Sequence, residues 1–287
     1  MNKINLKQSW DQIITHRKGW LDFNLKEIWK YRDLFKIYIH RNIVTQYKQT
    51  ILGPLWILIP PVLTTLVFTV IFGNIAQIST DGLPKPLFYM AGIVTWGYFS
   101  NVLSSTSNSL TGNMSIYGKV YFPRLIIPLS MLISSLIRYF VQLFLFGAMI
   151  FYYNFSNPNI LQIKIHLFIF LPIIIIIMGL QGLGFGLLFS AITSKYRDFR
   201  FLISFGLRLL MYASPVVFPL SIVSDKYKNI ILANPMTVII ESFRYMVFGV
   251  GEVSLNAILY SIIFTIMIFL FGCLIFNYIE KDFIDSA

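Results

Sequence analysis

The sequence GKVYFPRLIIPLS, residues Gly118–Ser130, joins two long apolar runs and sets the interpretation of the chain around it. It contains two cations, Lys119 and Arg124, and two prolines, but no acidic residue. Cytoplasmic loops of membrane proteins carry an excess of Lys and Arg, and proline interrupts a helix by removing a backbone donor. We therefore predict a basic, aromatic corner on the cytoplasmic face, exposed to a soluble partner.

Composition indicates a polytopic membrane protein. Hydrophobic residues make up 56% of the 287 residues, charged residues only 12%, and the mean hydropathy is +0.71. Soluble domains are about a quarter charged, whereas apolar runs of about 20 residues can cross a bilayer as helices. The single cysteine, Cys273, excludes an intramolecular disulfide and lies in an apolar run, as an inert core thiol does.

The net charge of +11 is concentrated near the N-terminus, where residues 1–50 contain ten Lys or Arg and four Asp or Glu. This distribution favours membrane orientation and attraction to anionic lipid headgroups over nucleic-acid binding. From Leu25 to Tyr47 apolar residues recur near helical spacing opposite a basic face. That pattern predicts an amphipathic helix along the inner membrane surface, the alternative being a packing helix of the kind found in soluble proteins.

We expect an all-α integral membrane fold of six transmembrane helices, with short re-entrant helices at the outer face between the fifth and sixth. Both termini would be cytoplasmic, because an even number of spans returns the chain to the side that holds most Lys and Arg. The expected organisation is a cytoplasmic segment 1–50 with an interface helix at about 25–47, a transmembrane domain 51–279 and a cytoplasmic tail 280–287. The spans are expected at about 55–75, 87–110, 125–153, 166–192, 201–217 and 257–279.

Two cations and a glycine pair lie inside these spans. Arg138 is far from both ends of the third span, where a charge costs about 2.5–3.5 kcal/mol and usually faces protein or water. Arg208 lies two turns into the fifth span, from which it could extend back to the surface or contribute to a pore. Gly182 and Gly186 have the spacing that allows close helix approach, which we favour over a hinge.

No pattern in the sequence predicts catalysis or metal binding. His16, His40 and His166 are isolated, and no Gly-rich loop ends in Gly-Lys-Ser/Thr. The six expected spans contain no carboxylate of the kind that ion-coupled carriers use. Glu241 precedes Arg244 by three residues in an apolar segment, which predicts a local helical ion pair. Energy for uphill transport must therefore come from a partner.

Four motifs follow one another along this frame: GPLW at Gly53–Trp56, KVYFPR and IPLS within Lys119–Ser130, YRD at Tyr196–Asp198, and NPM at the start of Asn234–Arg244. Together they resemble the ABC-2 type permeases of polysaccharide exporters, the membrane subunits that export O-antigen, capsule or teichoic acid chains. The resemblance extends from about residue 19 to the end of the sixth span.

The resemblance implies a homodimer in the bacterial inner membrane, joined to two copies of a separate cytoplasmic ABC ATPase that would bind ATP and Mg²⁺. This chain would then be a transport subunit and not an enzyme, with a lipid-linked glycan as substrate, membrane lipids around it and no nucleic acid or cofactor. Coupling helices are implied within Gly112–Arg124 and at Thr193–Arg200. The implied coupling residues are Tyr117, Lys119, Tyr121, Phe122, Arg124, Lys195, Arg197 and Asp198.

The family's channel is lined with aromatic side chains, over which sugar rings can slide through apolar C–H contacts. Each aromatic candidate in this chain could instead lie in the core or face lipid, and Arg138 could hold a lipid pyrophosphate, close an ion pair or bond carbonyls across the dimer. The channel candidates are Tyr89, Trp96, Tyr98, Phe99, Arg138, Tyr139 and Phe144. Short gating helices are implied in Phe218–Gly251, with Pro215, Asn234, Pro235, Glu241 and Arg244 as the outer gate.

The expected function is ATP-driven export of a lipid-linked polysaccharide across the inner membrane. The alternative within the same family is export of a small hydrophobic drug or lipid, for which a lateral apolar cleft would replace a wide aromatic channel. A membrane-bound enzyme of glycan assembly is a third possibility, against which the absence of an acidic dyad in the loops argues.

Overall fold

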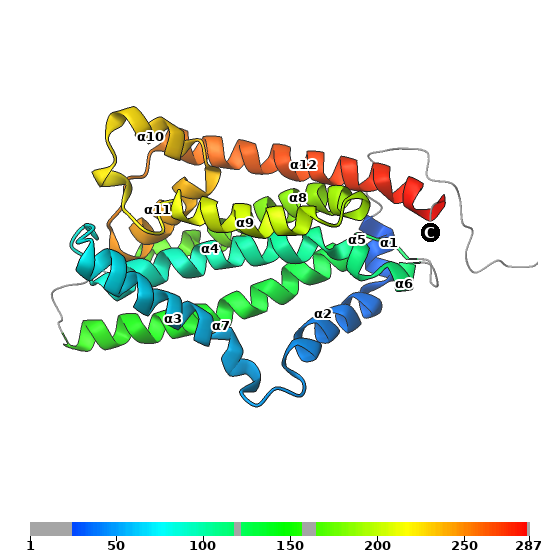
Figure 1. Ribbon diagram of the computed structural model, residues 1–287, viewed down its shortest axis with the longest axis horizontal. Helices are drawn as coiled ribbons and strands as arrows, with labels where there is room; N and C mark the ends of the chain where they lie inside the picture. Colours follow the sequence, from blue (N-terminus) through cyan, green and yellow to red (C-terminus); the bar gives the residue numbers. More distant parts are fainter. Residues whose placement is uncertain (1–24, 118–121, 157–164, 286–287) are drawn as a thin grey trace, which may run out of the picture.

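The computed structural model describes residues 25–117, 122–156 and 165–285, which are 82% helical and contain no strand. The all-α prediction is confirmed, and Figure 1 shows the long helices running side by side along the molecule. The α-helices are α1 (Leu25–Lys30), α2 (Arg32–Tyr47), α3 (Ile59–Phe68), α4 (Lys85–Ser107), α5 (Ser109–Gly112), α6 (Met114–Tyr117), α7 (Ile126–Ser156), α8 (Leu171–Lys195), α9 (Phe199–Tyr212), α10 (Asp225–Leu232), α11 (Pro235–Phe248) and α12 (Leu255–Asp285). Short 3₁₀ or π-helical segments occupy Gly53–Ile57, Thr69–Ile75, Ile165–Phe170 and Leu220–Ile222.

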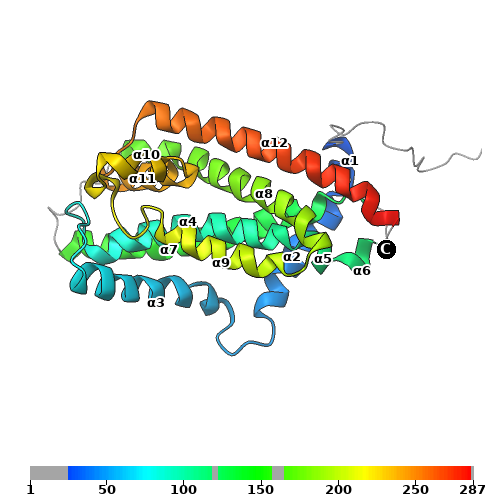
Figure 2. The same ribbon diagram turned by 45° about the horizontal axis from the view of Figure 1, so that its top comes forward.

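The central helix is α4, against which α3, α7, α8, α9 and α11 all pack (Figures 1 and 2). Its buried side chains include polar ones, among them Thr95, Thr106 and Ser107. A helix enclosed by other helices can satisfy such groups internally and need not be as apolar as one that faces lipid. The polar side chains of α4 lower its mean hydropathy, and α4 is therefore not among the helices, given next, that are long and apolar enough to cross a membrane.

Within the described residues, four helical segments are long and apolar enough to cross a membrane: Gly53–Ile75, Ile126–Ser156, Phe168–Lys195 and Leu255–Ile279. The pair α10 and α11, bent by 99°, would make a fifth if it forms one broken span. Six spans therefore stay a prediction.

The helix at the position of the fifth expected span, α9, has 14 residues and measures about 21 Å, less than the hydrocarbon thickness of about 30 Å. It ends at Tyr212, before the expected boundary at residue 217. Pro215 explains this early end, because proline has no N–H to donate and disfavours helical geometry in the residue before it.

Glycines on α8 allow its neighbours to approach closely. A Cβ on Gly182 would lie 2.9 Å from the carbonyl oxygen of Phe99, and one on Gly186 would lie 2.5 Å from the Cβ of Thr106. The close-packing interpretation of this pair is therefore confirmed. On the opposite side, a Cβ on Gly184 would lie 2.8 Å from the backbone nitrogen of Phe269, so α12 is held equally close.

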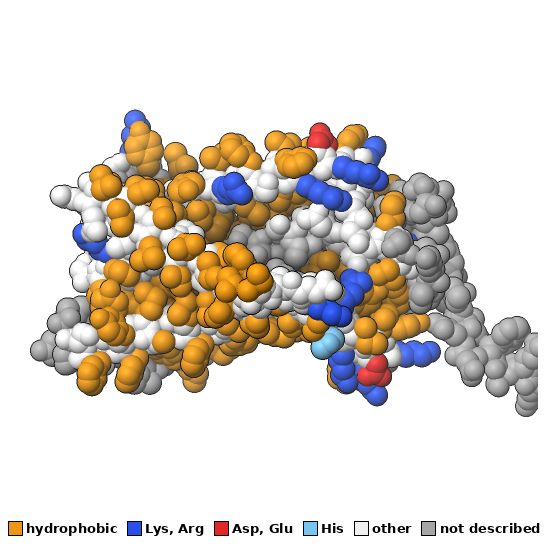
Figure 3. All heavy atoms as spheres, turned by 60° about the horizontal axis from the view of Figure 1, so that its bottom comes forward, with side chains coloured by type: hydrophobic (Ala, Val, Ile, Leu, Met, Phe, Trp, Pro, Cys, Tyr) orange, Lys and Arg blue, Asp and Glu red, His pale blue; other side chains and the backbone are white. Residues whose placement is uncertain are grey.

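The two ends of the bundle differ in charge. The helices α1, α2 and α6 and the end of α12 lie at one end, and α10 and α11 lie at the other (Figure 1). Figure 3 shows Lys and Arg side chains gathered at the first of these ends, with hydrophobic side chains covering much of the remaining surface. We call these the basic end and the α10–α11 end.

Candidate functional site

The α10–α11 end contains a buried ion pair. In α11 the Nη1 atom of Arg244 lies 3.3 Å from Oε1 of Glu241, and each side chain is only 1% exposed. The predicted helical ion pair is therefore confirmed, and it is far more deeply buried than its spacing alone indicates. Charges enclosed in this way are tolerated where they are paired and also hydrogen-bonded.

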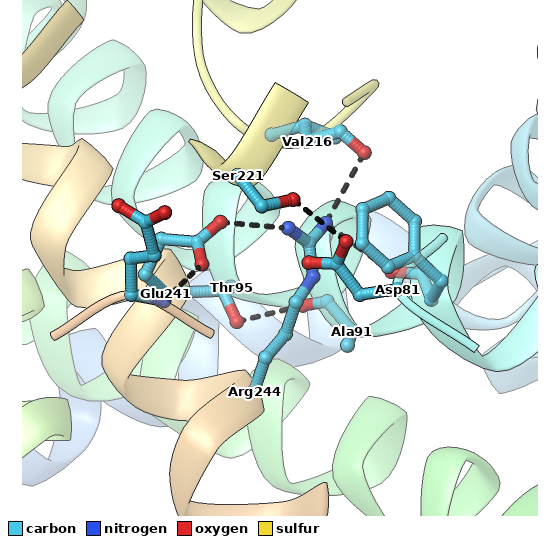
Figure 4. Close-up of polar contacts among 9 residues, drawn as sticks. Asp81, Ala91, Thr95, Val216, Ser221, Glu241 and Arg244 are labelled. Atoms are coloured by element: carbon cyan, nitrogen blue, oxygen red, sulfur yellow. Dashed lines mark hydrogen bonds and ion pairs between the residues drawn. The ribbon is translucent and has the colours of Figure 1, made fainter. Parts of the chain in front are cut away.

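Arg244 also joins α11 to two other segments. Its Nη2 atom donates to the carbonyl oxygen of Phe88 in α4 at 3.3 Å. The same atom donates to the carbonyl oxygen of Val216 beyond α9, also at 3.3 Å (Figure 4). Its guanidinium carbon lies 3.6 Å from the centre of the Phe88 ring, a cation–π contact in a water-excluded setting. Arg244 thus fixes the start of α4, the segment after α9 and α11 relative to one another.

Glu241 joins the same helix to the loop before α12. Its second carboxylate oxygen accepts a hydrogen bond from the backbone N–H of Glu252 at 3.2 Å. Gly251 has a φ of +142°, and a Cβ there would lie 2.9 Å from the carbonyl oxygen of Glu241. Only glycine suits that backbone conformation and that close approach. One ion pair therefore connects four separate segments.

The turn between α10 and α11 is fixed by Asn234. Its Oδ1 atom caps α11 by accepting from the N–H of Met236 at 3.1 Å, and its Nδ2 atom donates to Oγ of Ser214 at 2.8 Å. Pro235 occupies the first turn of α11, where its missing N–H costs nothing, and Pro215 is buried beside Ser214. The structure thus brings all five residues of the predicted outer gate into one region.

A second carboxylate lies on the exposed side of this region. Oδ1 of Asp81 accepts a hydrogen bond from Oγ of Ser221 at 2.6 Å, which joins the loop before α4 to the segment after α9 (Figure 4). Lys228 of α10 forms an ion pair with Glu252 nearby. Among the described residues, no group of three or more His, Cys, Asp or Glu side chains could hold a metal ion. The region therefore consists of hydrogen bonds and ion pairs that connect separate segments of the chain.

Most of the aromatic channel candidates lie in the core of the single chain, which is one of the alternatives that the sequence left open. Five of them, Tyr89, Trp96, Tyr98, Phe99 and Tyr139, are buried in the core of the single chain. The rings of Tyr98 and Tyr139 lie 4.8 Å apart, and those of Trp96 and Phe99 lie 5.3 Å apart. Within one chain these five side chains therefore pack between helices, and their part in a channel stays a prediction.

The two remaining channel candidates lie on α7. Phe144 is 82% exposed on the outside of the bundle. Arg138 is half-buried and donates from Nη2 to Oγ of Ser135 at 3.1 Å, on its own helix. Phe144 therefore lies outside the core that holds the five buried aromatics, and a role for Arg138 in a channel stays a prediction.

The described part of the first basic corner, residues 122–130, is covered, which corrects the expectation that it is exposed. Arg124 is 6% exposed and Phe122 is also buried, because α2 packs over them with the rings of Tyr38 and Phe122 5.9 Å apart. Lys119 and Tyr121 lie outside the described residues, and Tyr117 ends α6. The second corner, by contrast, exposes Lys195, Arg197 and Asp198 between α8 and α9.

Sequence reasoning missed the contacts that hold α2 in place. Nη2 of Arg41 donates to Oδ1 of Asn113 at 2.8 Å, and Asn42 donates to Oγ of Ser130 at 3.2 Å. The guanidinium of Arg41 also lies over the Tyr38 ring at 4.5 Å. Burial raises the pKa of the Tyr38 hydroxyl, an effect that the nearby charge of Arg41 partly opposes. Tyr38 and Arg41 are three residues apart, a spacing that places both on one face of a helix, and this spacing is the sequence signal that could have predicted their contact.

Two large apolar side chains of the N-terminal helices, Trp29 and Ile37, are exposed and can contact another surface. Trp29 is 71% exposed and Ile37 is 62% exposed, although other apolar residues of α1 and α2 pack on the protein. Large apolar side chains next to lysines are typical of helices at a membrane surface. The position of this helix at the membrane surface stays a prediction.

Arg208 is exposed on α9 and is flanked by the exposed side chains of Phe205, Leu209 and Tyr212. It lies nine residues beyond the start of α9, about 14 Å along the helix axis from the basic end. Within the hydrocarbon of a bilayer, a cation faces water or protein far more readily than lipid tails. The exposed side of α9 therefore differs from a purely lipid-facing surface.

Comparison with known proteins shows the family. The model of the ABC-2 type transporter family matches residues 33–248, which run from α2 to the end of α11. The chain belongs to the ABC-2 type transporter family. The matched range includes both basic corners and the Glu241–Arg244 ion pair, whereas Gly251, Glu252 and α12 lie beyond it. ABC-2 permeases work with ATPase subunits in exporters.

The similar proteins are transport permeases. The chain is 26% identical over 254 residues to the O-antigen export system permease protein RfbA of Klebsiella pneumoniae, covering 88% of this chain and 94% of that protein. It is 26% identical over 223 residues to the protein of that name from Myxococcus xanthus, covering 77% and 82%. It is 25% identical over 256 residues to the polysialic acid transport protein KpsM of Escherichia coli, covering 86% and 93%. With the several apolar helices, these matches indicate a multi-pass inner-membrane transport protein.

Proposed function

We propose that this ABC-2 permease is the membrane-spanning subunit of an ATP-driven exporter that moves a lipid-linked polysaccharide across the bacterial inner membrane. The observation that carries the proposal is similarity along nearly the whole length of O-antigen and polysialic acid export proteins. The proposed assembly is a homodimer with two copies of a cytoplasmic ATPase, which binds ATP and Mg²⁺. Both termini of the permease are then cytoplasmic.

The basic end supports this orientation and the site of coupling. Exposed Lys195 and Arg197 lie at the end where cations gather, as cytoplasmic segments of membrane proteins do (Figure 3). An acidic surface on the ATPase would complement these cations. Because the corner between α8 and α9 is short, a displacement of the corner by the ATPase would move both helices. Arg124 contributes indirectly, by holding the first corner in place under α2.

The exposed face of α9 is the proposed side of the translocation path. Arg208 is unfavourable in contact with lipid tails, and we infer that it meets water or the second copy of the chain here instead of extending back to the membrane surface. Aromatic side chains beside it, among them Phe205 and Tyr212, are exposed and offer faces on which sugar rings can slide. The path would then run between two copies and not through the aromatic core of one.

The region around Arg244, in which one ion pair connects four segments of the chain, is the proposed outer gate. Its hydrogen bonds reach the start of α4 and the segment after α9, so opening α11 outward requires breaking them together. Several hydrogen bonds of ordinary strength would keep this gate closed to ions and small solutes. The gate would open when the segments that carry the carbonyl groups of Phe88 and Val216 move away from Arg244.

Co-purification with candidate ATPase subunits, followed by a transport assay, tests the proposal. We expect a complex of two permeases and two ATPases whose ATP hydrolysis is stimulated by a lipid-linked glycan and not by small hydrophobic compounds. Stimulation by small hydrophobic compounds alone would instead establish the drug or lipid exporter. A permease dimer that binds no ATPase would refute both.

A further inference from the structure

A half-open apolar pocket of about 280 Å³ lies between α8, α11 and α12 and has no place in the proposed export path. Its walls are formed by Ile174 and Ile177 of α8, Ile239 and Met246 of α11, and Ile258 and Ile262 of α12. The residues from α8 and α12 lie near the starts of those helices, and Figure 2 shows the start of α12 beside α10 and α11, so the pocket belongs to the α10–α11 end of the bundle.

The pocket is too apolar to be a water site. Three of its lining residues carry a hydroxyl group, Ser242, Tyr245 and Ser261. Ser261 is already engaged, since it accepts from Nε2 of Gln181 at 3.2 Å and donates to the carbonyl oxygen of Pro235 at 3.2 Å. Water in a protein cavity needs two to four polar partners, whereas an apolar cavity of about 150 Å³ stays dry and takes up a hydrocarbon such as benzene. A pocket nearly twice that size and lined by isoleucines therefore suits a hydrocarbon.

The surface around the mouth of the pocket is suited to contact with lipid. Phe170 and Ile173 at its rim are each about half exposed. Between Leu171 and Ile192 the exposed side chains of α8 are all apolar, and between residues 259 and 271 those of α12 are Leu, Ile, Met and Phe, with Tyr260 donating to the carbonyl oxygen of Ala233. This surface has no counterpart of the exposed Arg208 on α9.

We propose that the pocket binds one acyl chain of a membrane phospholipid, from the leaflet on the α10–α11 side. An empty pocket would deprive its lining of dispersion contacts, which are the main packing force between apolar surfaces inside a bilayer. The chain would lie against Ile239 and Met246 of α11, whereas Glu241 and Arg244 of the same helix make the ties described above. Bound lipid therefore braces α11 on the side that its ion pair does not reach. The proposal requires only that the chain spans a membrane and does not depend on the exported substrate.

Photo-crosslinking tests this site in the intact permease–ATPase complex. The complex is reconstituted in nanodiscs of phosphatidylethanolamine and phosphatidylglycerol, in which part of the phosphatidylethanolamine carries a diazirine midway along one acyl chain. We expect label on Ile239 and Met246, which are buried and accessible only to a chain that has entered the pocket. Label confined to exposed residues of α8 and α12, with none on α11, would overturn the proposal.

A pair of matched variants makes the test specific. Ile177→Trp with Ile258→Trp fills the pocket, whereas Ile176→Trp with Leu259→Trp places the same two side chains on the neighbouring exposed positions. The filled variant should lose the label on α11 and keep the label on exposed α12 residues, and the control should keep both. If the filled variant fails to fold, Ile258→Trp alone replaces it.

Two further outcomes would contradict the proposal, the first on where the acyl chain binds and the second on which lipid it belongs to. Persistent α11 labelling in a folded, filled variant would show that the label does not arrive through the pocket. Displacement of the phospholipid label by a smaller amount of an isoprenoid phosphate lipid would assign the pocket to that lipid class instead. Loss of export without loss of α11 labelling would concern the proposed function alone, so the two proposals fail separately.

Discussion

The guanidinium of Arg244 occupies the space that a side chain at Gly92 would need. A Cβ on Gly92 would lie 2.9 Å from Nη2 of Arg244 and 3.0 Å from the Cα of Val216. The two residues belong to α4 and α11 and are far apart in the sequence. The absence of a side chain at Gly92 is therefore what lets Arg244 reach the carbonyl groups of Phe88 and Val216.

Gly92→Ala should destabilise the protein by about 1–3 kcal/mol, the usual cost of inserting a methyl group into a packed core. The backbone of Val216 cannot move aside as a flexible side chain would. Gly97→Ala is the control on the same helix, because its Cβ would meet only Oε1 of Gln142, at 3.9 Å. Thermal unfolding in detergent measures both, and equal midpoints for the two variants would contradict the tight fit.

Arg244→Met should destabilise the protein by about 3–5 kcal/mol, because it leaves the Glu241 carboxylate buried without its partner. The double variant Glu241→Gln with Arg244→Met removes both charges and should recover part of the loss. The measurement is the unfolding midpoint of each variant. The single variant Glu241→Gln completes the cycle, and a double variant whose loss equals the sum of the losses of Glu241→Gln and Arg244→Met would show that the pair is not coupled.

The exposed pair in α2 supplies the matched control for burial. Lys36 and Asp33 have the same separation, 3.3 Å, and the same spacing of three residues, but their side chains are 71% and 78% exposed. Lys36→Met should therefore change stability by less than about 1 kcal/mol. A loss comparable to that of Arg244→Met would mean that burial is not what distinguishes the two pairs.

Arg197→Glu should weaken association with the ATPase by about tenfold, or about 1.4 kcal/mol, without loss of thermal stability. The side chain is exposed at the proposed coupling corner, so reversing its charge affects a partner more than the fold. Arg124→Glu should instead lower the yield of folded protein, since it reverses a buried charge. Titration with the purified ATPase measures the affinity of Arg197→Glu, and the amount of monodisperse protein recovered in detergent measures the yield of Arg124→Glu. An Arg197→Glu variant with normal affinity would remove this corner from the interface.

Arg208→Leu should reduce export about tenfold, or about 1.4 kcal/mol in the transport barrier, while folding and ATPase binding stay normal. Arg208→Lys keeps the charge and should retain most of the activity. Accumulation of surface polysaccharide in cells that carry each variant is the measurement. Full export by the leucine variant would place the translocation path elsewhere and would return α9 to a role in packing.

Local spacing made some features predictable from the sequence. Glu241 and Arg244 are three residues apart, so any helix through them places both on one face, and Gly182 and Gly186 form a smooth strip on any helix. The hydrophobic composition required a membrane protein, and four short motifs in order indicated the ABC-2 family, which residues 33–248 match. None of these inferences needs to know which helices are neighbours.

The aromatic candidates and the first basic corner show where such reasoning stops. An aromatic residue in an apolar run has the same sequence signature in a core, at a lipid surface or along a channel. Only the enclosure of α4 by five other helices decided that Trp96 and Tyr98 are core residues. Similarly, the docking of α2 decided that Arg124 is covered, although its proline-rich surroundings are typical of an exposed loop.

The sequence by itself determined the all-helical membrane class, the family and the existence of an ion pair in α11. The tertiary structure alone decided what that pair does, because the acceptors of Arg244 lie 156 and 28 residues away along the chain. Helical periodicity specifies which side chains share a face, since it depends only on neighbours a few residues apart. Which distant carbonyl groups that face meets depends on how whole helices pack, and small contacts spread over many residues settle that packing.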